Sequence, residues 1–127
     1  MNPTYEKQIG DIGEGIAEKY LKRHKYQVFD KNFRSRGGEL DLIAFDLQDR
    51  NLLVFIEVKT KISNKYGGPI QNLTRDKVYK MWKTAWFYIK SKKLNKDIFR
   101  LDLITVKINK LTKTAKIKHL KAIGLAS

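Results

Sequence analysis

The sequence predicts one mixed α/β domain over residues 1–127, in which a helix, three strands, a second helix and two more strands follow in order. Three observations support this fold class. A chain of 127 residues suits one domain with a substantial hydrophobic core. A composition of 42% hydrophobic and 31% charged residues is typical of a globular protein. Segments with apolar residues at helical spacing flank short apolar runs that are typical of strands.

The first helix should begin at residues 2–4, where a polar residue before a proline can cap it, and end near residues 24–25. Its apolar face is made of Ile9, Ile12, Ile16, Ala17, Tyr20 and Leu21. Gly10, Gly13 and Gly15 interrupt this helix, and a glycine inside a helix costs about 1 kcal/mol relative to alanine. Close packing against a sheet or close approach of a ligand would justify them.

Three strands are predicted next, over residues 26–29, 40–45 and 52–60. Residues 30–38, which are polar and basic, are predicted to form a loop between the first two. Residues 46–51 are turn-like, so the second and third strands should form an antiparallel hairpin. Residues 63–74 contain Gly67-Gly68-Pro69 and are predicted to be a loop.

The second helix is predicted to start after Thr74, which can cap it, and to end in the lysine-rich segment 90–93. Its apolar face consists of Val78, Met81, Trp82, Ala85, Trp86 and Ile89. A fourth strand over residues 99–108 and a fifth over 115–120, joined by a turn, complete the domain.

Charge is the most pronounced global feature, with 27 Lys and Arg against 13 Asp and Glu, a net charge of +14 and a pI near 10.0. This excess predicts a polyanionic partner. Nucleic acid fits better than a membrane, because no segment is both basic and strongly amphipathic. The sequence has no cysteine, which excludes disulfides, thiolate zinc sites and a cysteine nucleophile. Without a signal-like or membrane-spanning apolar run, we expect a cytoplasmic protein.

Two predicted strands carry acidic residues where a buried strand should be apolar. Asp41 lies within the second strand, and Glu57 ends a run of the third that is apolar on both faces. Lys59, two residues further, shares a strand face with Glu57. If the hairpin pairs Phe45 with Leu53, Asp41 lies opposite Glu57 with β-carbons about 5 Å apart, whereas a slip of one residue would separate the two acids.

Ionised carboxylates in such runs are costly unless a partner compensates them, and a metal ion is the usual partner. With oxygen ligands only, Asp41, Glu57 and the Val58 carbonyl would suit Mg²⁺ or Mn²⁺. Such an ion could orient a water for attack on a phosphodiester, with Lys59 beside the reacting phosphate. The alternative is a surface ladder of salt bridges on an edge strand, because this spacing of acids and lysine often occurs by chance. The apolar residues around the acids favour the metal site.

The motifs around these acids resemble those of the YraN family of small, uncharacterised bacterial proteins. The matching segments are Gly13-Glu14-x-x-Ala17-x-x-Tyr20-Leu21, Asn32-x-Arg34, Gly38-Glu39-Leu40-Asp41-Leu42-Ile43, Val54-Phe55-Ile56-Glu57-Val58-Lys59 and Arg100-x-Asp102. The similarity extends from about residue 10 to residue 106. That family is similar to the PD-(D/E)xK nuclease superfamily and to archaeal Holliday-junction resolvases.

The resemblance implies a restriction-endonuclease-like core in the order αβββαβ, with metal-dependent cleavage of phosphodiester bonds. It would make Asp41 and Glu57 metal ligands, Lys59 the catalytic lysine, and Glu14 of the first helix an additional acid near the metal. Leu40 departs from the pattern, because the superfamily is named for a proline at that position. Without the resemblance, Glu14 is better explained as a solvated carboxylate at the border of the buried helix face.

Basic residues around the predicted centre are candidates for contacts with nucleic-acid phosphates. These are Arg34, Arg36, Lys61, Lys65, Arg75 and Lys77. Lys77 would act together with the N-terminus of the second helix, although a solvated lysine explains it equally well. Each of the others, taken alone, could be ordinary surface charge.

Other polar and aromatic residues carry weaker functional signals. Gln71 could reach the centre from its loop. Trp82 and Trp86 could stack on bases, but their place in the apolar face of the helix favours core packing. We assign no role to His24 or His119. Arg100 and Asp102, two residues apart on the fourth predicted strand, suggest a structural ion pair.

We therefore expect an endonuclease that uses Mg²⁺ or Mn²⁺ to cut DNA, with branched or junction DNA as a candidate substrate. A two-fold homodimer would suit the symmetric cleavage of a junction. Two alternatives need only the same positive charge. One is a nucleic-acid-binding module on a nuclease-like scaffold without turnover, and the other is an RNA- or ribosome-associated structural protein.

Overall fold

The computed structural model describes residues 3–63 and 73–124. Its elements, in chain order, are α1 (Pro3–Arg23), β1 (Tyr26–Ser35), β2 (Gly38–Asp46), β3 (Leu52–Ser63), α2 (Arg75–Ser91), β4 (Phe99–Asn109) and β5 (Thr114–Leu120). The predicted order of elements and the mixed α/β fold class are confirmed. Neither of these two helices is long and apolar enough to cross a membrane.

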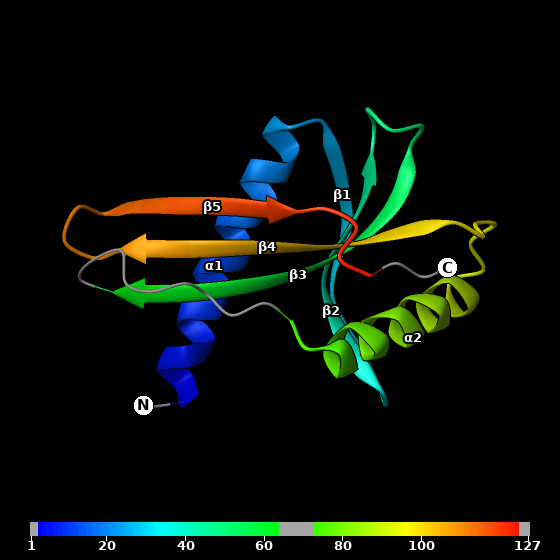
Figure 1. Cartoon of the computed structure of the whole chain (residues 1–127), viewed down its shortest axis with the longest axis horizontal. Helices are drawn as coiled ribbons and strands as arrows, with labels where there is room; N and C mark the ends of the chain where they lie inside the picture. Colours follow the sequence, from blue (N-terminus) through cyan, green and yellow to red (C-terminus); the bar gives the residue numbers. More distant parts are fainter. Residues whose placement is uncertain (1–2, 64–72, 125–127) are drawn as a thin grey trace.

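The strands form one five-stranded sheet in the order β1-β2-β3-β4-β5. β3 and β4 run parallel, with α2 between them in the chain, whereas the other neighbouring pairs are antiparallel. Figure 1 shows β3, β4 and β5 lying side by side, while β1 and β2 turn steeply away from them. The sheet therefore changes direction between β2 and β3, the two strands that carry the predicted acids.

The two helices pack on opposite faces of the sheet, and β3 contributes apolar side chains to both faces. Val54 belongs to a buried cluster with Leu21 of α1. Phe55, the next residue, belongs to a second buried cluster with Met81 of α2. The prediction that β3 is a central strand, apolar on both faces up to Glu57, is confirmed.

One of the three helix glycines is required by the packing of α1 on the sheet. A β-carbon added at Gly13 would lie 1.7 Å from the Thr60 hydroxyl oxygen of β3. A β-carbon at Gly10 or Gly15 would meet nothing within 4 Å. Gly13 thus allows α1 to lie directly against β3, which fixes the position of the following residue, Glu14.

Gly13→Ala should therefore destabilise the fold, whereas Gly10→Ala on the same helix should not. The first substitution forces a side chain into Thr60, and such overpacking typically costs about 1–3 kcal/mol. The second removes a flexible glycine from a helix and should stabilise by up to about 1 kcal/mol. Urea denaturation of both variants measures the difference. Equal stability of the two proteins would contradict the close packing of α1 on β3.

The prediction of a loop over residues 30–38 is wrong. β1 continues to Ser35 and pairs with β2, with a bulge between Val28 and Asp30, and only a tight turn at residues 36 and 37 separates the two strands. β1 is an edge strand whose exposed positions alternate with partly buried ones, so a polar sequence is compatible with strand structure there. β3 also extends three residues beyond the predicted end at Thr60.

Candidate metal centre

The predicted register of the β2–β3 hairpin is confirmed. Phe45 pairs with Leu53, and the pairing continues to Leu42 and Ile56. Beyond this point the backbone pairing ends, and the Asp41 side chain takes its place: its Oδ2 accepts a hydrogen bond of 2.7 Å from the Val58 amide. The two strands separate here, and the Asp41 carboxylate takes the place of a backbone hydrogen bond between β2 and β3.

Asp41 and Glu57 meet at this opening as a pair of buried acids. Their side chains are close enough to hydrogen bond to each other. Only 9% of Asp41 and 7% of Glu57 is exposed. Burial, and then the neighbouring Asp41 charge, raises the pKa of Glu57 to about 8. Burial also raises the pKa of Asp41, although the hydrogen bond from Val58 works against this. Burial therefore disfavours the ionised form of the pair more than the nearby Lys77 ammonium favours it.

Glu57 is the less satisfied of the two acids. Its Oε2 lies 3.5 Å from the Lys77 ammonium of α2. Its Oε1 is buried and has no hydrogen-bond partner among the described residues. Buried oxygen atoms without a partner are rare in folded proteins, so Oε1 is a free acceptor in a buried place that a cation could occupy.

Lys77 is held toward this pair by the way α2 begins. Thr74 caps the helix, and its hydroxyl accepts a hydrogen bond of 3.1 Å from the Lys77 amide, which confirms the predicted cap. The Lys77 side chain is then free to turn to the sheet, where it meets Glu57. Sequence reasoning named Lys77 as a phosphate contact and missed this ion pair, because no local pattern tells which strand the helix start will approach.

Glu14 approaches the two acids from α1, on the opposite side of the sheet opening from α2. Burial, followed by the charges of Asp41, Asp11 and Glu39, raises the pKa of Glu14 to about 7. Glu14 is therefore close enough to Asp41 for the charge of Asp41 to raise the pKa of Glu14. Within the described ranges, however, no three His, Cys, Asp or Glu side chains lie close enough together to hold one ion. The protein groups at the centre amount to two adjacent acids, with Glu14 further out.

The remaining predicted site residues differ in how exposed their side chains are. Lys59 follows Glu57 on β3 and is half-buried. Four of the predicted phosphate contacts are exposed: Arg34, Arg36, Lys61 and Arg75. Arg34 forms an ion pair of 3.5 Å with Glu39 across the β1–β2 hairpin. Lys65 and Gln71 lie outside the described residues.

A second buried polar cluster lies on β4, away from the acid pair. Arg100 binds both oxygens of Asp102 at 2.9 Å and reaches Asp46 at 3.1 Å, so the predicted ion pair is confirmed and extended. His119 of β5, to which the sequence assigned no role, contacts Asp102 at 2.7 Å and the hydroxyl of Tyr20 at 3.1 Å. This cluster joins β4 to β2, β5 and α1 and is structural.

Trp82 and Trp86 were expected to pack in the core, and they do so only in part. Both are half-buried and pack against the cluster on the α2 face. The rest of each side chain is exposed to solvent, so core packing explains the position of only part of each indole ring.

Comparison with known proteins identifies relatives over most of the chain. Residues 13–106 match the family described as "Uncharacterised protein family UPF0102". A UPF0102 protein of Clostridium tetani is 42% identical over 118 residues, which cover 93% of this chain and 94% of that protein. A UPF0102 protein of Clostridium botulinum strain Kyoto is 45% identical over 116 residues, which cover 91% and 92% of the two chains.

Proposed function

Because the chain belongs to the YraN-like, uncharacterised family UPF0102, we propose a function from its own site: a metal-dependent endonuclease that hydrolyses phosphodiester bonds of DNA. The observation that carries this proposal is the buried pair of Asp41 and Glu57, in which one Glu57 oxygen has no hydrogen-bond partner among the described residues. The link to the PD-(D/E)xK nucleases, which the motifs suggest, belongs to the same proposal.

The residues at the opening fit a small, hard divalent cation. Carboxylate oxygens from Asp41 and Glu57, with the Val58 carbonyl as the predicted third protein ligand, suit Mg²⁺ or Mn²⁺, which keep several waters in such sites. A cation there would satisfy Glu57 Oε1 and relieve the repulsion within the pair. When bound, it would supply Lewis-acid stabilisation of the reacting phosphate and lower the pKa of a water that attacks it.

We assign proposed roles to three side chains around the pair. Lys77, now paired with Glu57, would turn its ammonium to a substrate phosphate once the negative charge of Glu57 is compensated. Lys59 would offset negative charge that develops on the phosphate during cleavage. Glu14, whose pKa is raised to about 7 by burial and nearby acids, would accept a proton from the attacking water.

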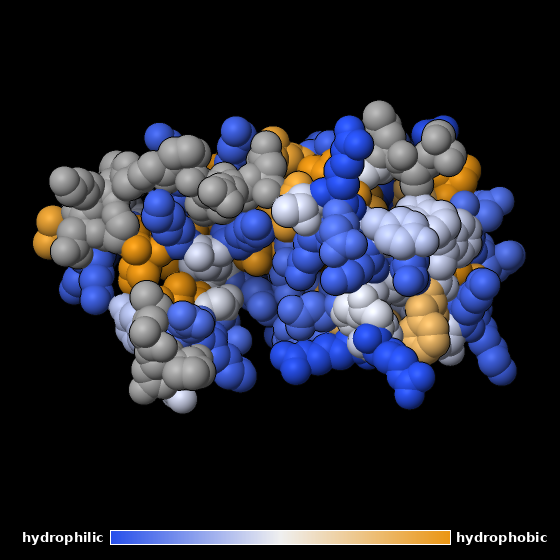
Figure 2. Space-filling model, turned by 60° about the horizontal axis from the view of Figure 1, so that its bottom comes forward, coloured by the Kyte–Doolittle hydropathy of each residue, from blue (hydrophilic) through white to orange (hydrophobic). Residues whose placement is uncertain are grey.

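The surface of the protein supports a polyanionic substrate. The net charge is +14, and Arg34, Arg36, Lys61 and Arg75 are exposed on the elements that surround the centre. Figure 2 shows a face covered largely by hydrophilic side chains, with small apolar areas between them. Lys and Arg on such a surface bind phosphates without reading sequence.

A cleavage assay tests the proposal. Purified protein is incubated with a four-way junction, a flap, a blunt duplex and a folded RNA, in Mg²⁺, in Mn²⁺ and in chelator. Metal-dependent strand cuts in DNA support the nuclease, and paired cuts in a junction would support action as a homodimer. Tight binding without cuts in either metal would favour the DNA-binding module. Preference for the RNA at matched salt would favour the RNA-associated protein.

Glu57→Gln should make the metal-free protein more stable, because it removes a buried acid whose Oε1 has no partner in the part of the chain that the structure describes. Thermal melting in chelator should show a higher melting temperature than the wild type at neutral pH. Adding Mn²⁺ should raise the melting temperature of the wild type and leave the variant unchanged. Asp97→Asn, at an exposed loop position, is the control and should match the wild type in both conditions. A variant less stable than the wild type in chelator would contradict the account of Glu57.

A further inference from the structure

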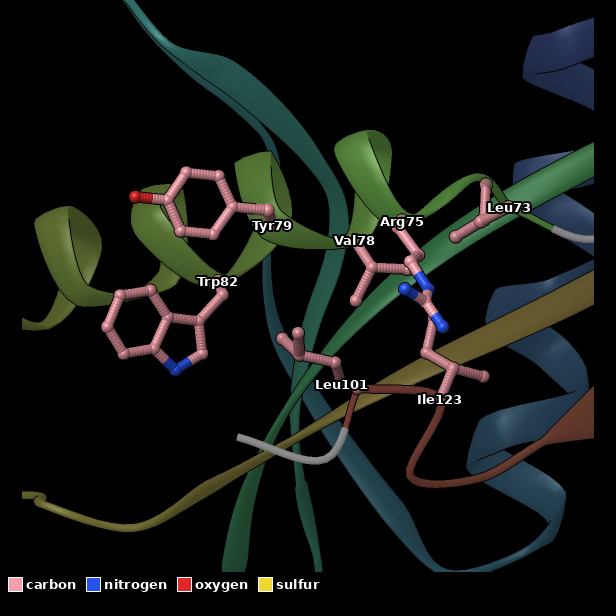
Figure 3. A pocket seen from close by; sticks show the side chains of 8 residues that line it. Leu73, Arg75, Val78, Tyr79, Trp82, Leu101 and Ile123 are labelled. Carbon is pink, nitrogen blue, oxygen red and sulfur yellow. The ribbon is translucent and has the colours of Figure 1, made fainter. Parts of the chain in front are cut away.

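A cavity between α2 and the sheet has a lining that combines aromatic, apolar and cationic side chains. It measures about 680 Å³ and lies between α2, β4 and the segment after β5. Figure 3 shows Tyr79 and Trp82 at one end, Arg75 at the other, and the apolar Val78 and Leu101 between them. The volume falls in the range of small-ligand pockets, and the lining combines aromatic, aliphatic and cationic groups.

Tyr79 and Trp82 form a flat aromatic platform. Their ring planes are inclined by only 13°, and their centroids lie 6.3 Å apart. Figure 3 shows the two rings beside each other, both seen face-on. Tyr79 is 57% exposed, whereas Tyr88 of the same helix is buried. The Lys83 ammonium lies 5.3 Å from the centre of the Tyr79 ring and adds a second cation to this surface.

The wall opposite the platform is fixed to the sheet. The Ile123 amide donates a hydrogen bond of 2.8 Å to the Leu101 carbonyl, and the Ala122 amide donates one of 3.0 Å to Asp102. A β-carbon at Gly124 would lie 2.8 Å from Val78 and 3.0 Å from Leu101, so the chain passes close to the cavity floor. The cavity is therefore preformed on its apolar side.

The cavity adjoins a second one, which reaches the strand next to the acid pair. An adjoining cavity of about 290 Å³ shares Leu73, Val78 and Ile123 with it and extends to Leu103. Leu103 is the residue of β4 that pairs with Glu57 of β3. Along α2, Trp82 lies five residues beyond Lys77, a rise of about 8 Å. Both cavities thus lie along the part of α2 that begins beside Glu57.

We propose that this cavity receives an unpaired nucleobase of the bound nucleic acid, stacked on Tyr79 and Trp82, with Arg75 contacting the adjacent phosphate. Single-strand-binding proteins use aromatic faces in this way, because every base offers a π-face to stack on. The net charge of +14 favours a nucleic acid over a peptide as the occupant. The substrate class is then nucleic acid with single-stranded nucleotides beside the acid pair, rather than a continuous duplex.

Binding measurements in chelator test this inference without any cleavage. A fluorescent blunt duplex is compared with the same duplex carrying a short single-stranded DNA or RNA overhang, at one salt concentration. Wild type should bind the overhang substrates about tenfold more tightly than the blunt duplex. Tyr79→Ala should lose most of this advantage and leave affinity for the blunt duplex within about twofold, while Tyr79→Trp should keep it.

Phe87→Ala is the matched control. Phe87 is also an exposed aromatic of α2, at 54%, but it faces Phe33 and does not line the cavity. It should retain the overhang preference. No preference in the wild type, or equal losses for both substrates in Tyr79→Ala, would overturn the inference. A 2-aminopurine in the overhang adds a direct readout, because stacking quenches its fluorescence. The inference rests on the proposed nuclease only for the role of Asp41 and Glu57, so a protein that does not cut can still confirm it.

Discussion

Asp41→Ala should abolish metal-dependent cleavage, with a loss of at least about 1,000-fold, or ~4 kcal/mol of transition-state stabilisation. Asp41 supplies one of the two buried carboxyl groups at the opening between β2 and β3, and its Oδ2 also holds the Val58 amide in place. Glu57→Ala should give a loss of the same order. The double variant should be no worse than either single one, because the two acids would act as a unit on one ion.

DNA binding should remain near the wild-type level in both variants, since the exposed cations around the centre are untouched. Asp97→Asn removes an exposed carboxylate from a loop and should keep full activity. Rates are measured under single-turnover conditions in Mn²⁺, together with affinity in chelator. Cleavage retained by Asp41→Ala protein that is free of contaminating nuclease would refute the proposed mechanism.

Arg100→Leu should destabilise the fold by about 3–5 kcal/mol, the cost of removing one partner of a buried ion pair. Arg100 is the cation shared by Asp46, Asp49 and Asp102, and its side chain is only 11% exposed. Its loss would leave Asp102, which is fully buried, with fewer donors for its charge. Arg50→Leu is the control: Arg50 pairs with Asp49 at the surface, is 94% exposed, and should change stability little.

The pH dependence of stability gives a second readout for the same cluster. Although burial alone would raise it, hydrogen bonds from His119, Arg100 and Ala122 lower the pKa of Asp102 below the usual 3.8. Its contribution to stability is therefore present above pH 3.8 and is lost as the pH falls through the lower pKa of the folded state. Wild type should lose this stability in acid, and Asp102→Asn should not. Urea denaturation in neutral and acidic buffers compares them, and identical pH profiles would contradict the role of Asp102.

The sequence predicts the acid pair well because it depends on a local hairpin. Residues 46–51 leave little freedom in how β2 returns as β3, so the pairing of Phe45 with Leu53 follows from alternation and turn length. The proximity of Asp41 and Glu57 follows from this pairing alone and can be predicted without the rest of the fold. Their burial could also be predicted, because β3 is apolar on both faces.

Features that depend on distant contacts could not be predicted. The ion pair between Lys77 and Glu57 depends on where α2 docks after a long connection, and the role of His119 depends on the register of β5 against β4. The predicted first strand ended too early, because local patterns assign polar residues to a loop, whereas an edge strand tolerates them. Tyr79 was overlooked for a related reason: an exposed aromatic on a helix gives no sequence signal until the opposite wall of its cavity is known.

A crystal structure of the protein soaked in Mn²⁺, with anomalous data collected at the manganese edge, would show whether a metal ion binds between Asp41 and Glu57. We expect one strong peak between the carboxyl groups of Asp41 and Glu57, within bonding distance of Glu57 Oε1, and its loss in Glu57→Gln crystals treated in the same way. An acid pair that stays metal-free at a Mn²⁺ concentration that supports cleavage would contradict the claim that this opening in the sheet is the metal centre.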